Sequence, residues 1–144
     1  MKNLITILFF CVAFAGGAMA EGMKHYIAIH VDQNDPKVMN MALNNAANIT
    51  KYYDSVGDTV EIELVAYGPG LNMFIEEKSP VADRIKVMSL EMDNLSFSAC
   101  GNTLRKMNAK AGHELPVMEE ATVVPSGVVR LIELQEKGYA YVRP

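Results

Sequence analysis

The sequence predicts one three-layer α/β/α domain built on a mostly parallel, five-stranded sheet. Short apolar runs alternate with helical patterns of about 10 to 15 residues, which is typical of parallel strands joined by crossover helices. Residues 59–67 begin with alternation and finish as an apolar run, as in a strand buried on both faces. The chain has 144 residues and half of them are apolar, which is enough for one hydrophobic core.

The first strand and the first helix have clear local signals. Residues 24–31 are rich in β-branched and aromatic side chains and predict a strand. Asp35 and Pro36 supply an N-cap and a first-turn proline, and the helix that follows is expected to end near Gly57. Its inward stripe is expected at Val38, Met41, Ala42, Asn45, Ala46, Ile49, Tyr52 and Tyr53.

The remaining elements follow from breakers and periodicity. Gly68-Pro69-Gly70 ends the second strand, at residues 59–67. The later elements are then a short helical turn at 71–76, a helix at 80–92, a strand at 95–99, a helix to about 110, a loop or irregular helix at 113–121, a strand at 122–124, a helix at 127–137 and a terminal strand at 139–142.

The first twenty residues predict a secretory signal peptide. Lys2 lies in a short positive segment, residues 4–17 are apolar, and Ala18-Met19-Ala20 fits the small-x-small rule for cleavage. The mature domain is therefore expected at residues 21–144, in the periplasm. The apolar segment is too short for a comfortable membrane span, and we expect no membrane association after cleavage.

Charge and motifs exclude several classes of function. The formal net charge is −4, with no dense basic run, so nucleic-acid binding is not expected. The phosphate-binding and redox motifs GxGxxG, GxxxxGK[ST] and CxxC, and the zinc motif HExxH, are absent from the sequence. Met39 and Met41, with His25 or Met23, raise the question of copper, but core packing is the ordinary role of such methionines. We predict no metal and no cofactor.

The candidate site lies where the parallel strands end, because open sheets of this kind bind ligands outside the carboxyl ends of their strands. The strand-end positions are His30 and Asp32 after the first strand, Tyr67, Gly68, Pro69 and Gly70 after the second, Cys100, Gly101, Asn102 and Thr103 after the third, and Pro125, Ser126 and Gly127 after the fourth. Asn48, on the first helix, points either back toward this edge or into solvent.

Cys100 is the residue that most needs explaining, because it is the one cysteine left after cleavage and exported domains tend to pair or eliminate cysteines. The N–H groups of the following helix would stabilise its thiolate, Gly101 would let a substrate approach, and Asn102 offers side-chain donors. The alternative is a small buried hydrophobic residue. His30 is either a base for this thiol or a partner for a neighbouring carbonyl.

Several segments together resemble the exported branch of the DsrE/DsrF-like superfamily. They are IHV at 29–31, ALNNAANI at 42–49, VEIELVAYGPGL at 60–71, FSACGNTL at 97–104 and the C-terminal segment 123–144. The resemblance implies a YchN-like α/β fold, assembly into trimers or hexamers, and membership of a group that includes sulfur carriers. Cys100 matches the cysteine that receives a persulfide in the cytoplasmic carriers. His30, Asn48, Gly68 and Gly70 match pocket positions.

Two functional hypotheses follow. The first is a periplasmic sulfur relay in which Cys100 takes sulfur from a donor protein or a small sulfane compound and passes it to an acceptor. The second is a non-catalytic oligomeric module whose strand-end pocket holds a small anion or thiol, with Cys100 structural. Both include self-association, to which Phe74, Ile75 and the strand at 139–141 are expected to contribute.

Overall fold

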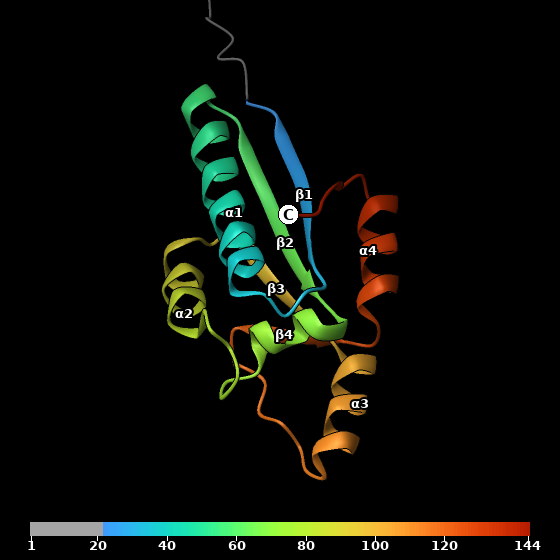
Figure 1. The fold of residues 1–144 in the computed structure, drawn as a ribbon. Helices are drawn as coiled ribbons and strands as arrows, with labels where there is room; N and C mark the ends of the chain where they lie inside the picture. The colour runs from blue at the N-terminus through green and yellow to red at the C-terminus, as the bar shows by residue number, and fades with distance from the viewer. Residues whose placement is uncertain (1–21) are drawn as a thin grey trace, which may run out of the picture.

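Five parallel strands form the central sheet of the computed structural model, which describes residues 22–144 (Figure 1). The predicted signal peptide, residues 1–20, lies outside the described residues. The strands are β1 (Lys24–Val31), β2 (Thr59–Ala66), β3 (Leu95–Cys100), β4 (Ala121–Val124) and β5 (Ala140–Val142), in the spatial order β4-β3-β2-β1-β5. Every neighbouring pair of strands is parallel, which confirms the predicted fold class.

The helices lie on both faces of this sheet (Figure 1). They are α1 (Pro36–Val56), the 3-10 helix η1 (Gly68–Phe74), α2 (Ala82–Glu91), α3 (Gly101–Ala111) and α4 (Gly127–Glu136). The core residues of α1, η1 and α2 pack on one face, where α3 adds Leu104 and Met107, whereas α4 packs on the opposite face. No helix within residues 22–144 is long and apolar enough to cross a membrane.

Helix α1 begins and ends where its sequence signals predict. The Asp35 side chain accepts a hydrogen bond from the Lys37 N–H at 2.8 Å, and Gly57 ends the helix in the left-handed region at φ 81°. The expected inward stripe is partly wrong, because Met41 is 44% exposed and Tyr52 is 62% exposed. The buried residues are Met39, Ala42, Leu43 and Ala46. The helix is rotated so that two large side chains one turn apart meet the sheet and two alanines allow close approach.

The segment after β2 differs from the prediction, since η1 begins at Gly68 rather than at Leu71. Gly68 has φ 54°, and a Cβ on Gly70 would lie 2.3 Å from the Val31 carbonyl oxygen, so η1 packs directly against the end of β1. Phe74 and Ile75 are fully buried in this arrangement. They therefore cannot contribute to a self-association surface, which corrects that expectation.

The two faces of the sheet differ in chemistry. The α1 face holds the large apolar core, whereas the α4 face has a small cluster of Ala28, Val65, Leu131 and Leu134. Side chains alternate between faces along a strand, so His30, Glu63 and Ser98 share the α4 face with Ala28 and Val65. These three are the buried polar residues of the described chain, and they make the α4 face the place to look for function.

Candidate functional site

Cys100 lies where the connections that follow two neighbouring strands, β3 and β4, lead to opposite faces of the sheet. It is the last residue of β3 and pairs with Val124 at the end of β4. The chain then enters α3 after Cys100 and α4 after Ser126, and these two helices pack on different faces. In open parallel sheets such a divergence creates the crevice where ligands bind.

The surroundings of the Cys100 thiol favour its anion. The residue is only 4% exposed, and burial by itself raises the pKa of the thiol. The Thr103 hydroxyl and the backbone N–H groups of Gly127, Thr103 and Asn102 outweigh burial, so the pKa lies below its ordinary value. The side chain makes no capping hydrogen bond of ordinary geometry with α3. These groups therefore act on the sulfur as oriented dipoles from the first turns of two helices.

Two close contacts hold these donors in place. The Gly68 N–H donates to the Thr103 hydroxyl oxygen at 2.9 Å, which leaves the hydroxyl proton free to point toward the sulfur. A Cβ on Gly127 would lie 3.1 Å from the Cys100 Cβ and 3.0 Å from the Tyr67 Cβ. Glycine at position 127 is what allows α4 to begin so close to the thiol.

A second polar group lies on the same face, on the other side of Tyr67. The His30 ring stacks on Tyr67, with ring centroids 4.4 Å apart, and its Nδ1 lies 2.7 Å from the Tyr141 hydroxyl. Burial lowers the pKa of His30, while Asp32 raises it and Arg143 lowers it further, so the ring is neutral near pH 7. Its Nε2 is buried and has no hydrogen-bond partner among residues 22–144. A buried ring nitrogen without a partner marks a place where a ligand can bind.

The structure brings some of the expected site residues together and separates others. The backbone N–H of Asn102 acts on the Cys100 sulfur, His30 joins the site through Tyr67, and Gly68 joins it through Thr103. Gly101 instead serves packing, because a Cβ there would lie 2.9 Å from the Val124 carbonyl oxygen at the end of β4. The Asn102 side chain is exposed and accepts a hydrogen bond from Arg105 instead.

Gly70 and Asn48 have other roles. Gly70 is buried against β1, where its missing side chain serves packing. Asn48 is exposed on α1, which covers the opposite face. It also stands twelve residues after Pro36, roughly 18 Å along the helix from the strand ends. Asn48 therefore does not join the group around Cys100.

Several side chains at the site were not expected from the sequence. Tyr141 reaches His30, and Arg143 forms an ion pair with Asp32 at 2.8 Å. On the same face the Glu63 carboxylate is 5% exposed and binds both Arg130 and Ser98. Glu63 could have been noticed, because a charged residue inside an otherwise apolar strand needs a partner. The identity of that partner is not visible in the local pattern.

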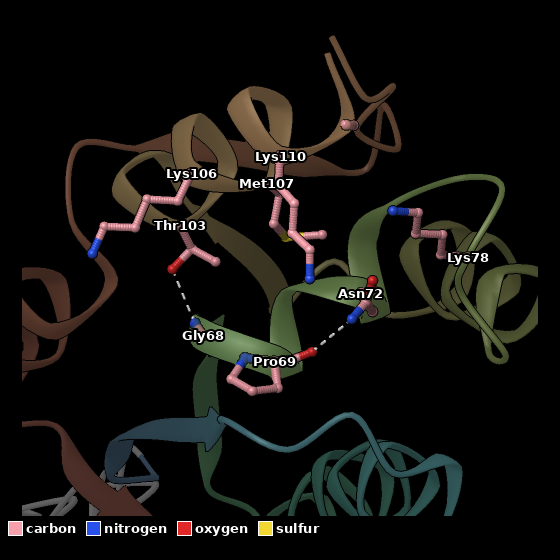
Figure 2. A pocket seen from close by; sticks show the side chains of 9 residues that line it. Gly68, Pro69, Asn72, Lys78, Thr103, Lys106, Met107 and Lys110 are labelled. Carbon is pink, nitrogen blue, oxygen red and sulfur yellow. Dashed lines mark hydrogen bonds between the residues drawn. The ribbon is translucent and has the colours of Figure 1, made fainter. Parts of the chain in front are cut away.

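A groove of about 510 Å³ opens between η1 and α3, beside Thr103 (Figure 2). It is lined by Gly68, Pro69, Asn72, Lys78, Thr103, Lys106, Met107, Lys110 and Ala111. Figure 2 shows the amines of Lys78 and Lys110 turning toward the space near Asn72, while Lys106 extends past Thr103. None of these lining residues is acidic, so the groove is locally cationic on a chain whose net charge is −4.

The described residues contain no group of three or more His, Cys, Asp or Glu side chains that could hold a metal ion. Met39 lies in the core and Met41 on the surface of α1, so these two side chains do not converge on a shared site.

These features define a parallel α/β domain with one thiol held between the first turns of two helices. The chain belongs to the DsrE/DsrF-like family, whose model matches residues 24–144. It is also similar to a solved protein of unknown function from Methanobacterium thermoautotrophicum, with 28% identity and a TM-score of 0.69 over 83% of this chain and 99% of the other. No curated protein matches the chain.

Proposed function

We propose that the protein is an exported sulfur carrier that holds sulfane sulfur on Cys100. The observation that carries this proposal is a buried thiol directly before α3, with the first residue of α4, Gly127, packed against it. In this place Thr103 and three backbone N–H groups lower the pKa of the thiol. These donors stabilise a sulfur anion, which is the form that attacks a sulfane donor and also the form of a bound persulfide. Membership of the DsrE/DsrF-like family supports the same assignment.

The proposed reaction conserves atoms and electrons. The Cys100 thiolate attacks the outer sulfur of a persulfide R–S–SH, a new S–S bond forms at Sγ, and the bond inside the donor breaks. The donor leaves as the thiolate R–S⁻ with the bonding electron pair, and Cys100 carries S–SH. An acceptor thiolate then attacks this outer sulfur and restores the Cys100 thiolate. No external oxidant or reductant is needed.

His30 is the group that we assign to proton exchange beside this chemistry. Its ring is neutral near pH 7, so it can accept a proton or, in the other tautomer, donate one. The unpartnered Nε2 is the nitrogen available for that exchange, because Nδ1 is engaged by the Tyr141 hydroxyl. Tyr67 lies between the ring and the Cys100 side of the site.

Export and assembly belong to the same proposal. The N-terminal segment supports cleavage after Ala20 and release into the periplasm, which a mature N-terminus at Glu21 in a periplasmic fraction would test. A trimer or hexamer is supported by half-exposed apolar side chains on β4 and α4, namely Val123, Val128, Val129 and Ile132. Light scattering of the purified protein tests assembly, and a monomer at micromolar concentration would contradict it.

The deciding experiment measures the intact mass of native protein purified anaerobically from the periplasm, with and without reductant. We expect the mass of one added sulfur atom, either on the protein as purified or after treatment with polysulfide. Reductant should remove this sulfur, and the Cys100→Ser protein should not acquire it. Methionine oxidation adds oxygen instead and is not readily reversed by thiols. If the folded thiol neither reacts with iodoacetamide nor takes up sulfur, while the unfolded chain does both, the proposal is wrong.

The cationic groove favours a second candidate, a module that binds a small anion and uses Cys100 only structurally. Lys78, Lys106 and Lys110 supply the charge, and the volume suits a small ligand. Calorimetry with inorganic sulfate tests it in the Cys100→Ser protein. Binding that is lost in Lys110→Met and kept in Lys86→Met, an exposed lysine on α2, would support this candidate. Equal affinity in both variants would contradict it.

A further inference from the structure

An ion pair between the buried Glu63 and the partly exposed Arg130 links α4 to the sheet close to the thiol. Arg130 donates to both Glu63 carboxylate oxygens at 2.7 Å, from Nε and from a terminal guanidinium nitrogen. The Ser98 hydroxyl donates to the same carboxylate at 2.6 Å, so residues of β2, β3 and α4 meet at one point. A two-pronged contact of this kind restricts both the position and the rotation of a helix.

The apolar contacts of α4 are too few to set its rotation alone. Only Leu131 and Leu134 of this helix enter the apolar cluster on that face, against Ala28 and Val65. Val128, Val129 and Ile132 are about half exposed in a single copy of the chain, so they add little to the contact between α4 and its own sheet. A helix held by such a narrow strip can rotate or slide at small cost, so a directional contact is needed to select one arrangement.

Stability alone does not account for this pair. Replacing a buried ion pair with apolar residues of similar volume is often neutral or stabilising, because desolvation offsets the attraction between the charges. Orientation is what the pair supplies and an apolar contact does not. Arg130 stands three residues after Gly127, less than one helical turn, and its own N–H donates to the Ser126 carbonyl at 2.9 Å. The pair therefore acts on the turn of α4 that faces Cys100.

We propose that Glu63, Arg130 and Ser98 are positioning residues that hold the Gly127 N–H of α4 against the Cys100 sulfur. The inference rests on the proposed role of Cys100 and adds to it the part of the fold that prepares the thiolate. The groups with the largest influence on the Cys100 pKa are Thr103 and the backbone N–H groups of Gly127, Thr103 and Asn102. We therefore assign the effect of the three positioning side chains to the placement of Gly127.

The test is the pH profile of Cys100 alkylation by iodoacetamide in Glu63→Gln, which keeps the size of the side chain and removes its charge. We expect the midpoint to move to higher pH and the rate below the midpoint to fall by about threefold, because a lost donor reduces the thiolate fraction more than it raises nucleophilicity. The sign is diagnostic. Removing a nearby negative charge without moving α4 would instead favour the thiolate and move the midpoint to lower pH.

Two further variants keep the test decisive. Ser98→Ala removes one hydrogen bond and should move the midpoint in the same direction by less, which covers the case in which Glu63→Gln does not fold. Glu133→Gln removes the exposed carboxylate 3.6 Å from Arg130 and should leave the profile unchanged. In the wild type, the Gly127 amide resonance should shift as Cys100 titrates, and this response should weaken in Glu63→Gln.

An unchanged midpoint in folded Glu63→Gln and Ser98→Ala, or an equal change in Glu133→Gln, would overturn the inference. Sulfur uptake is scored separately by intact mass. Failure of uptake in the wild type, with the midpoint shift present, would remove the carrier function and leave the positioning role standing. Normal sulfur uptake with no shift of the alkylation midpoint would remove the positioning role and leave the carrier function standing.

Discussion

Thr103→Val is the most direct perturbation of the proposed thiolate site. Valine keeps the shape of threonine and removes the hydroxyl, which accepts from Gly68 at 2.9 Å and acts on the Cys100 thiol. A hydrogen bond to a charged group contributes about 1.5–3 kcal/mol, and each 1.4 kcal/mol is about tenfold in an equilibrium. Because the backbone N–H groups remain, we take the lower end. The thiolate fraction below the midpoint should fall by about tenfold.

The assay is the rate of iodoacetamide alkylation across pH, supported by urea unfolding. A less acidic thiol gives a more nucleophilic thiolate, with a Brønsted slope of about 0.4–0.5, so the rate below the midpoint should fall by only about threefold. The midpoint itself should move to higher pH. Loss of the acceptor for the Gly68 N–H should also cost about 1–3 kcal/mol of unfolding free energy.

Two variants complete the design. Thr103→Ser retains the hydroxyl and should keep the wild-type midpoint, whereas Thr122→Val removes an exposed hydroxyl from β4 and should change neither rate nor stability. A folded Thr103→Val protein whose alkylation midpoint equals that of the wild type would refute the reasoning. In that case the side chain of Thr103 serves η1 alone.

Three further predictions follow from the packing. Gly70→Ala should lower the free energy of unfolding, measured in urea, by about 1–3 kcal/mol, because the new Cβ would lie 2.3 Å from the Val31 carbonyl oxygen. The control is Asn48→Ala, at an exposed position on α1, whose free energy of unfolding should stay within about 0.5 kcal/mol of the wild type. Burial raises the pKa of Glu63, but Arg130 and Ser98 lower it more, so the folded pKa lies below 4.5. The ionised Glu63 therefore stabilises the fold above pH 4.5, and this stabilisation is lost as the pH falls through the folded pKa. The difference in unfolding free energy between wild type and Glu63→Gln should shrink over that pH range. A difference that stays constant with pH would contradict this prediction. Tyr141→Phe should cost about 1 kcal/mol by leaving the His30 Nδ1 without its partner, while Tyr52→Phe, 62% exposed, should cost nothing measurable.

The sequence determined the order and type of the elements, because their signals are local. Asp35, Pro36 and Gly57 mark the ends of α1 within a single stretch of chain, and the apolar run of β2 indicates a strand covered on both faces. The same reasoning placed Cys100 at a strand-to-helix junction, directly before the first turn of α3. These inferences need only residues a few positions apart.

Only the tertiary structure decided which side chains meet. The contacts that define the site join residues far apart in sequence: Glu63 with Arg130, His30 with Tyr141, and Gly68 with Thr103. Strand order and the face that each helix covers bring them together, and local patterns carry neither. The rotation of α1 was mispredicted for the same reason, since several faces of that helix are apolar enough to be buried and contact with the sheet selected one. Long-range packing sets which of several locally acceptable arrangements has the lowest free energy, and for this chain it assembled the surroundings of the thiol.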